Sequence, residues 1–435
     1  MQADVPVQGP EARPMVSVMV LSGRACRTLL LPGLAAVLLA LAACDEVVEF
    51  PPGCGGPPHP PGGSFTTYCE RVVGFPSLFP GKRDGSPEEE RIRARRAEAE
   101  AARVTAMHDR GGTGTGQLVG TIESGANPQH PDLTGKFPHI CAMGDCDDGR
   151  PNRRAGDRSP RFDLDGHGTQ VNGIIAARRN GTGVYGVAHE ARIASFGHAA
   201  STVHPWGNDC YGGSCPPGEK RHQWSALFDQ EIARGVDWMT SLGVRVTNFS
   251  WGRTYEWSRE KETRFGLTED SVRLIMPVTL GAFEAYVGAG GVAVWAAGNG
   301  DSLHPVVEGM LPRYFPALEK GWLAVVGIGR DGRRIGHFSH YCGDAAEWCI
   351  AAPGVVVTTH HDGRWIDAGG TSIAAPYVAA GLAALKSLFP NLTHHQIRDC
   401  MLATADRRPP YDDRRIYGRG RLDLDAASRR CGEGR

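Results

Sequence analysis

The sequence has no surplus of charge of either sign. Its 47 Lys and Arg residues face 48 Asp and Glu residues, which leaves a formal net charge of −1 at pH 7. Proteins that bind nucleic acid depend on a basic surface that neutralises phosphates. We therefore expect no nucleic-acid partner. At 435 residues the chain is nevertheless long enough for one large hydrophobic core with appendages.

The sequence also lacks the motifs of several other function classes. It has no CxxC pair and no His spacing typical of a zinc site, so we expect no metal to be held in that way. The G-x-S-x-G elbow of the α/β-hydrolases is absent, which disfavours that fold. The glycine-rich run at 111–116 precedes a strand instead of joining a strand to a helix, so it is not a dinucleotide-binding turn. We expect no required cofactor.

The first 43 residues contain an apolar run that is too short to span a bilayer comfortably. Arg24 and Arg27 precede "TLLLPGLAAVLLALAAC", which Pro32 interrupts. This arrangement predicts a signal peptide over residues 1–43, with a transmembrane anchor as the alternative. The run ends in "LAAC", which resembles the lipobox of bacterial lipoproteins and implies a lipid on Cys44. We therefore expect a lipid-anchored protein of the bacterial cell envelope, on its periplasmic or cell-surface face.

Ten cysteines remain once Cys26 in the signal and Cys44 at the anchor are set aside. Each has a near neighbour in the sequence and none is left over, as expected for a disulfide-bonded protein of an oxidising compartment. The expected pairs are Cys54/Cys69, Cys141/Cys146, Cys210/Cys215, Cys342/Cys349 and Cys400/Cys431.

Three segments follow the signal. Residues 44–87 are rich in Pro and Gly and predict a tether, and residues 88–104 are dense in Glu, Arg and Ala and predict a solvated helical connector. From residue 105 to residue 430, short apolar strands alternate with helical stretches, which predicts an α/β domain with a mostly parallel central sheet and helices on both faces. The expected strands are "QLVGTI", "ARIASFG", "VRVTNFS", "GVAVWAAG", "WLAVVGIG" and "CIAAPG".

Two polar residues stand at the edges of apolar elements. Glu123 ends the first predicted strand, where an unpaired charge is costly, unless the strand stops at Ile122 and the carboxylate is solvated. His167 lies between two glycines in "DLDGHGTQVNGIIAA", at the start of a predicted helix. Glycine on both sides lets partners approach the ring, which suits a general base, although a lone His is more often structural.

Two further residues follow glycine-rich turns. Ser372 opens the apolar helix of "GGTSIAAPYVAAGLAALKSLF", where the positive end of the helix favours an oxyanion. The alternative is that Ser372 only caps the helix. Asn299 follows the strand of "GVAVWAAGNGD", so its amide could point at that oxyanion or simply suit the turn.

Acid, His, Asn and Ser in this chain order resemble the subtilisin-like serine peptidases. The resemblance covers roughly residues 105–428 and implies a subtilisin-like three-layer sandwich. The cysteines of "CGDAAEWC" are most similar to those of the peptidase passengers of bacterial autotransporters. The segments that carry the resemblance are "TGTGQLVGTIESGANPQHPDL", "GHGT", "VRVTNFSWG", "GTSIAAPYVA", "FSHYCGDAAEWCIAAPG" and "GRGRLDLDAA".

The resemblance implies a role for each of the four residues. Ser372 is the nucleophile and His167 the general base, and Asn299 forms the oxyanion hole with the Ser372 N–H. Glu123 stands where the family has Asp, and it orients the imidazole. Because Glu is one methylene longer, its carboxylate reaches the His Nδ1 only if the side chain folds back or the strand end shifts. The substrate-binding residues are Ser250, Trp251, Gly252, Ala297 and Gly298.

These roles imply a serine endopeptidase that hydrolyses polypeptides through an acyl-enzyme, with Glu-His-Ser in place of Asp-His-Ser. We expect it to be a monomer. The alternative is a catalytically weak or inactive relative that binds peptides in the envelope, and Glu123 is the feature that favours this alternative. Calcium is common in the family, and the acidic loop "GDCDDG" (144–149) is a place for it, but the sequence assigns no ligand set.

Overall fold

The computed structural model describes the chain in segments. These are residues 16–22, 25–31, 46–48, 71–72, 99–101, 103–142, 145–146, 163, 166–198, 219–253, 268–300 and 302–433.

The chain divides into two units, Met1–Glu46 and Val47–Arg435. In the first unit, strands β1 (Val16–Ser22) and β2 (Ala25–Leu31) pair as an antiparallel hairpin within the predicted signal peptide. Cys44 lies outside the described residues, so its lipidation stays a prediction. Among the helices that the structure describes, none combines the length and the apolar character needed to cross a membrane.

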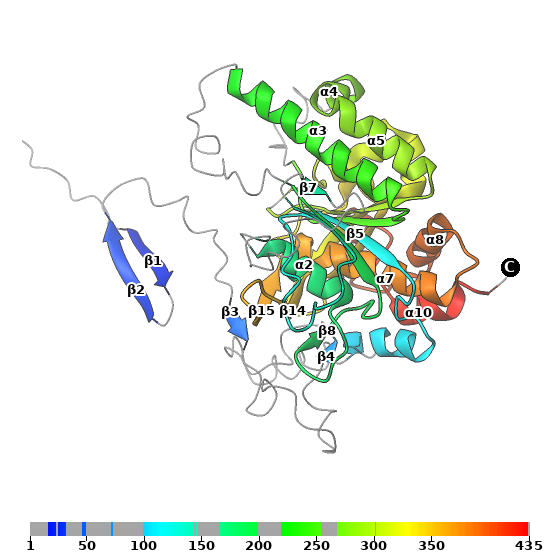
Figure 1. The fold of residues 1–435 in the computed structure, drawn as a ribbon, viewed down its shortest axis with the longest axis horizontal. Coiled ribbons are helices and arrows are strands. Elements are labelled where there is room, and N and C mark those ends of the chain that lie inside the picture. Colours follow the sequence, from blue (N-terminus) through cyan, green and yellow to red (C-terminus); the bar gives the residue numbers. More distant parts are fainter. Residues whose placement is uncertain are drawn as a thin grey trace, which may run out of the picture. The chain divides into compact units, whose positions relative to one another are not determined.

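A central sheet of eight strands organises the second unit (Figure 1). Its order is β13-β12-β11-β10-β5-β9-β6-β7, and each neighbouring pair for which a register is given runs parallel except β6 with β7. All six strands expected from the sequence are present, because their apolar residues are buried. The strands are β5 (Leu118–Glu123), β6 (His139–Ala142), β7 (Asp145–Cys146), β9 (Arg192–Gly197), β10 (Val246–Phe249), β11 (Val292–Ala296), β12 (Trp322–Ile328) and β13 (Cys349–Pro353).

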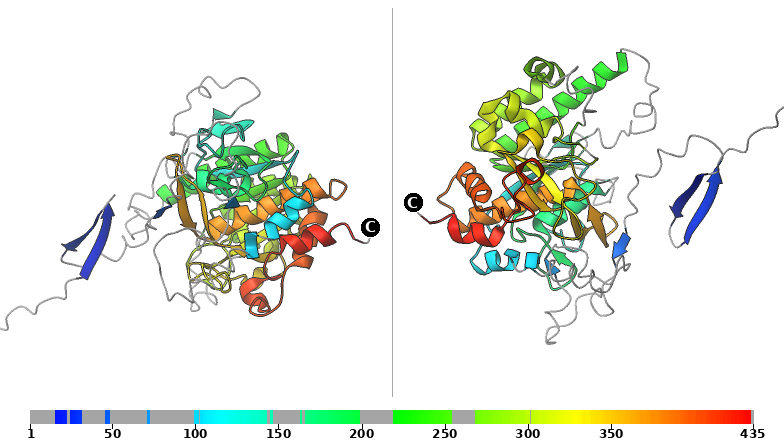
Figure 2. Two further views of the ribbon diagram at one scale, coloured as in Figure 1. Left: turned by 90° about the horizontal axis from the view of Figure 1, so that it is seen from below. Right: turned by 180° about the vertical axis from the view of Figure 1, so that it is seen from behind.

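Helices cover both faces of this sheet, which confirms the predicted fold class (Figures 1 and 2). One buried cluster joins the sheet to α2 and α7, and a second joins it to α3 and α5. Small residues let α7 lie directly on the strands, as its Ala-rich sequence predicts. The helices of the two faces are α2 (His167–Ala176), α7 (Thr371–Leu388), α8 (His394–Thr404) and α10 (Leu424–Arg430) on one, and α3 (Glu219–Ser241), α4 (Glu269–Ile275) and α5 (Pro277–Gly288) on the other.

Smaller elements complete the unit. Strands β14 and β15 form an antiparallel pair, and β4 pairs with β8. The bounds of the remaining elements are β3 (Glu46–Val48), β4 (Arg71–Val72), β8 (Val184–Tyr185), β14 (Val355–Thr359), β15 (Trp365–Gly369), α6 (Leu311–Tyr314), α9 (Arg414–Tyr417), and the 3₁₀ turns η5 (Glu308–Met310), η6 (Pro316–Gly321) and η7 (Gly343–Ala345).

The predicted boundary between the connector and the domain falls inside a helix. Residues 99–101 and 103–109 are helical, and Val104 and Met107 are fully buried in the cluster on the α7 face. The expectation of a solvated connector up to residue 104 is therefore wrong at its end. The apolar side chains that anchor this helix are few, and the Glu- and Arg-rich run before them conceals the pattern.

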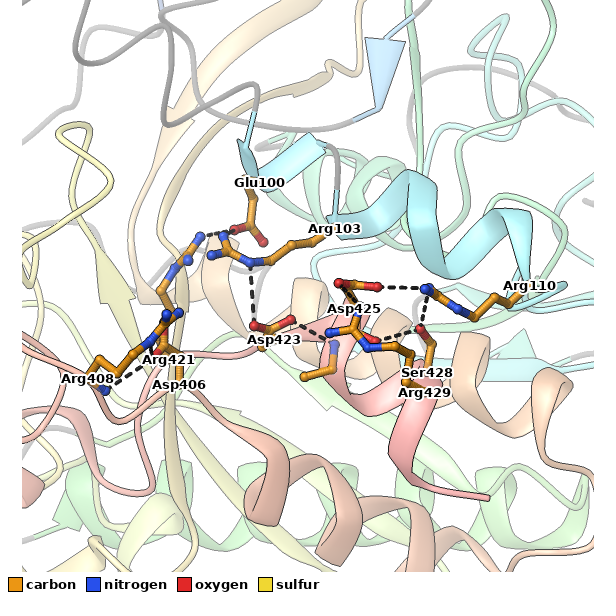
Figure 3. Close-up of polar contacts among 11 residues, drawn as sticks. Glu100, Arg103, Arg110, Asp406, Arg408, Arg421, Asp423, Asp425, Ser428 and Arg429 are labelled. Carbon is orange, nitrogen blue, oxygen red and sulfur yellow. Dashed lines mark hydrogen bonds and ion pairs between the residues drawn. The ribbon is translucent and has the colours of Figure 1, made fainter. Parts of the chain in front are cut away.

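Charged residues tie this N-terminal helix to the end of the chain (Figure 3). Glu100 is 1% exposed and contacts the guanidinium of Arg421, which is 6% exposed. Arg103 lies 3.6 Å from Asp423, and the Arg110 guanidinium donates to Asp425 at 2.9 Å. The helix at 99–109 is thus clamped to the segment that leads into α10.

Removing one side of the buried pair is expected to destabilise the domain strongly. In Glu100→Ala the guanidinium of Arg421 stays buried without its carboxylate, which lowers the free energy of unfolding by about 3–5 kcal/mol. Urea denaturation measures this change. Glu269→Ala is the matched control, since it breaks the exposed pair with Arg273 and should cost below about 0.5 kcal/mol. Equal losses in the two variants would contradict the clamp.

The structure confirms two of the five predicted disulfides. Cys342 is bonded to Cys349, and Cys400 to Cys431. Cys141 is also disulfide-bonded, and Cys146 lies directly opposite it in the β6–β7 register. The other four cysteines, Cys54, Cys69, Cys210 and Cys215, lie outside the described residues.

Candidate active site

The predicted site residues meet at one edge of the central sheet. Glu123 ends β5, Ser250 follows β10, and Asn299 follows β11. These three strands are neighbours in the order β5-β10-β11 and run parallel. Their carboxyl ends therefore lie side by side, which is where parallel α/β sheets place their sites.

Glu123 is buried and fully engaged. Its side chain is 2% exposed, so the alternative of a solvated carboxylate is wrong. One oxygen, Oε2, lies 3.0 Å from Nδ1 of His167, and the other accepts the backbone N–H of Ser250 at 2.6 Å. A carboxylate that meets a ring nitrogen in this way accepts its hydrogen, so Nδ1 is the nitrogen that carries the proton in this contact. The longer side chain of Glu therefore does reach the imidazole.

His167 is the first residue of α2, and the glycine after it makes the close contact of this helix possible. A Cβ on Gly168 would lie 2.0 Å from the carbonyl oxygen of Gly125, in the turn after β5. Any larger residue would push the helix away from that turn and separate His167 from Glu123.

Asp163 and Ser124 hold this junction, although neither is among the site residues predicted from the sequence. Asp163 is fully buried and accepts hydrogen bonds from the Ser124 hydroxyl at 2.7 Å and from the N–H groups of Gly166 and Thr169 at 3.1 and 2.6 Å. Ser124 in turn accepts the N–H of Gly168 at 2.8 Å. The one available signal was an acid four residues before the His in "DLDGHGT".

Ser372 occupies the second position of α7, after the cap residue Gly370. Since Gly370 is the cap, the alternative that Ser372 only caps the helix is wrong. Ser372 is 9% exposed, and its backbone carbonyl accepts the hydroxyl of Ser250 at 2.8 Å. Ser250 therefore connects the carboxylate of Glu123 to the start of α7, while α2 and α7 pack against each other.

Asn299 is oriented by the first residue of the same helix. Its Oδ1 accepts the N–H of Thr371 at 2.9 Å and the hydroxyl of Thr371 at 3.0 Å, so Nδ2 is the end left to face a ligand. A Cβ on Gly370 would lie 3.0 Å from Ser372 Oγ and 3.3 Å from Asn299 Nδ2. Both atoms thus border one small space, which glycine at 370 keeps open; its φ of 150° also disfavours a larger residue.

The predicted substrate-binding residues flank this space on two segments. Ser250 to Gly252 leave the end of β10, and Ala297 and Gly298 leave the end of β11. The N–H of Ser250 already donates to Glu123. A peptide that pairs with Ser250 must therefore donate to the carbonyl oxygen of Ser250. The indole N–H of Trp251 donates to the carbonyl of Ile122 at 2.7 Å, which fixes the ring on the β5 side.

His130 and His189 are two further buried histidines. Burial lowers the pKa of His130 and of His189 to about 4 in each case, so both are neutral at pH 7. The two ring nitrogens of His130 are bound to the carbonyl of Arg364 and the N–H of Asp132. Both nitrogens of the His130 ring are therefore occupied by backbone groups.

The structure shows no metal site within the residues it describes. No group of three or more His, Cys, Asp or Glu side chains there could hold an ion. The acidic loop 144–149 lies mostly outside the described residues, so calcium binding stays a prediction.

The sequence and the fold are similar to those of known proteases. The chain is 38% identical to Serotype-specific antigen 1 of Mannheimia haemolytica over 142 residues, which span 31% of this chain and 15% of that protein. It is 26% identical to Subtilisin E of Bacillus subtilis over 75% of this chain and 69% of that protein. The crystal structure of MycP1 from the ESX-1 type VII secretion system matches with a TM-score of 0.53 and 25% identity, over 74% of this chain and 83% of that one.

A second solved structure supports the fold. The prenylagaramide maturation protease PagA matches with a TM-score of 0.53 at 18% identity, over 76% of this chain and 99% of that one. The sequence model of the Subtilase family matches residues 114–425, which include every predicted catalytic residue. The chain belongs to the subtilase family.

Proposed function

We propose that the chain is a serine endopeptidase with a Glu123-His167-Ser372 triad. The observation that carries the proposal is the continuous set of contacts from His167 through Glu123 and Ser250 to the backbone of Ser372. A peptide-binding protein has no need for a buried carboxylate that holds an imidazole.

In the proposed reaction, Ser372 Oγ attacks the scissile carbonyl carbon and His167 Nε2 takes the hydroxyl proton. Glu123 stabilises the imidazolium that forms, and the amide of Asn299 and the N–H of Ser372 donate to the oxyanion. His167 then gives the proton to the leaving amine, which breaks the peptide bond and leaves an acyl-enzyme. Water, activated by the same imidazole, attacks the acyl group and restores Ser372.

The proposed substrate is an extended polypeptide. Its backbone would lie along Ser250 to Gly252 and pair with their backbone groups, as peptides do when they add a strand to an exposed edge. The reacting carbonyl would then fall between Ser372 and Asn299.

Hydrolysis of unfolded casein tests the function. The purified chain should release acid-soluble peptides, and prior treatment with a fluorophosphonate should stop the release. The competing function is an inactive peptide-binding protein, for which Glu123 in place of Asp is the motivation. That protein would bind casein without cleaving it, with or without the inhibitor.

We also propose that a lipid on Cys44 anchors the protein in the bacterial envelope, because the predicted signal peptide ends in the motif "LAAC". Cys44→Ser should move the protein from the membrane fraction to the soluble envelope fraction, because acyl chains supply most of the membrane affinity. Fractionation followed by a salt wash measures this. Cys26→Ser, in the predicted signal, is the control and should leave the distribution unchanged. A Cys44→Ser protein that stays on washed membranes would contradict lipidation.

A further inference from the structure

The side chain of Val306 occupies the space between the two predicted substrate-binding segments. From this we infer that the peptidase cleaves after small residues, namely Gly, Ala and Ser. The inference rests on the proposed function and concerns the pocket for P1, the residue on the amino side of the bond that is cut.

The two segments form facing walls next to the catalytic residues. They leave β10 and β11, which are paired in parallel register up to Phe249 and Trp295. One wall ends in Gly252 and Arg253, and the other ends in Gly298 and Asn299. A peptide whose carbonyl carbon sits at Ser372 would direct its P1 side chain between them.

A short stretch crosses from one wall to the other and closes this space. The N–H of Val306 donates to the carbonyl of Ala297 at 2.8 Å, and the N–H of Val307 donates to the carbonyl of Arg253 at 3.1 Å. Val306 is 2% exposed. The two hydrogen bonds therefore hold the backbone of Val306 across the gap, and burial restricts the movement of its side chain.

The two methyl groups of Val306 touch one wall each. A Cβ on Gly252 would lie 2.4 Å from Val306 Cγ2, and a Cβ on Gly298 would lie 2.7 Å from Val306 Cγ1. The valine thus reaches the backbone of both glycines, and at Gly298 the ring of His340 lies equally close. A large P1 side chain would have to displace it from a packed position, which interiors resist.

The carboxylate of Glu308, two residues after Val306, does not create a binding site for a basic P1 side chain. Glu308 is 1% exposed, and its carboxylate accepts the N–H of Arg253 at 2.8 Å. The other oxygen lies 2.8 Å from the Nε of the same arginine. Arg253 therefore already supplies the cation that a P1 Lys or Arg would offer, and it locks the closing stretch to the first wall.

Mass spectrometry of a casein digest tests the inference. Sites cut by the wild-type chain should carry Gly, Ala or Ser at P1, and tetrapeptide p-nitroanilides should give a kcat/KM at least about 10-fold higher for P1 Ala than for P1 Leu or P1 Arg. Cuts mainly after Leu, Phe, Lys or Arg would overturn the inference and leave the proposed function standing. A lack of any cleavage, together with no labelling by a fluorophosphonate, would instead overturn the proposed function.

Two matched variants assign the preference to this side chain. Val306→Ala removes both methyl groups from the gap and should raise the ratio of kcat/KM for P1 Leu over P1 Ala by about 10-fold. Val307→Ala removes the same two groups from the adjacent residue, which is packed in the cluster on the α3 and α5 face, and should leave the ratio unchanged. The two kcat/KM values in each ratio are measured on one preparation, so a smaller amount of folded protein lowers both equally and leaves the ratio unchanged. An unchanged ratio in Val306→Ala would overturn the inference.

Discussion

Glu123→Gln should lower kcat by about 10⁴-fold, as a triad with the wrong imidazole tautomer does. The amide has the shape of the carboxylate, and its oxygen can still accept the N–H of Ser250. The NH₂ group of the glutamine then faces Nδ1 of His167 and cannot accept a proton from it. The imidazole therefore carries its proton on Nε2, which can no longer act as a base. Hydrolysis of a p-nitroanilide measures the loss. Equal activity in the wild type and the variant would remove Glu123 from the mechanism.

The variant Glu123→Asp tests whether the geometry of the site suits Glu or whether Glu123 is a substitution that has lowered the activity of the enzyme. The carboxylate of Glu123 bonds to His167 and Ser250 at once, and a side chain one methylene shorter cannot keep both contacts in the same backbone. We expect about 10-fold lower kcat/KM, which is about 1.4 kcal/mol of transition-state stabilisation. Higher activity in Glu123→Asp would show that Glu is a defect and would favour the weakly active alternative.

Ser372→Ala should abolish proteolysis of unfolded casein, with a fall in kcat of about 10⁶-fold, because the residue that forms the acyl-enzyme is gone. The fold should survive, since the contact that ties this position to Ser250 uses the backbone carbonyl of residue 372. Thermal unfolding checks the fold and casein release checks the activity.

Ser387→Ala on the same helix is the control for that variant. Its hydroxyl accepts the N–H of Gly114 at 2.9 Å, far along α7 from the site. This change should lower stability slightly and leave hydrolysis intact. Casein cleavage that persisted in Ser372→Ala would contradict the assignment of the nucleophile.

The elements of the core could be predicted because each carries its own periodic pattern. The strand at Trp322–Ile328 is a continuous apolar run, and α7 follows a glycine turn with small residues along its length. The helix at 99–109 was misjudged because two residues, Val104 and Met107, anchor it within a charged segment. Its burial depends on the Arg421 region, more than 300 positions away in the sequence, which no local pattern reports.

The candidate catalytic side chains stand in motifs that the sequence displays, but the contacts that support them do not. Nothing local to Glu123 indicates that its second oxygen meets the N–H of Ser250, since the two residues are 127 positions apart. The same holds for the contact of Val306 with two glycines that follow different strands. Such pairings depend on which strands are neighbours in the sheet. The alternation of strands and helices in the sequence predicts a parallel sheet but not the order of its strands.

The most direct test of the triad is to locate a fluorophosphonate on the purified chain by mass spectrometry of its peptides. We predict one phosphonate per molecule, attached to Ser372, and labelling slowed at least about 10³-fold in His167→Ala, because the hydroxyl then has no base. An adduct on another residue, or equal labelling rates with and without the imidazole of His167, would contradict the proposed mechanism.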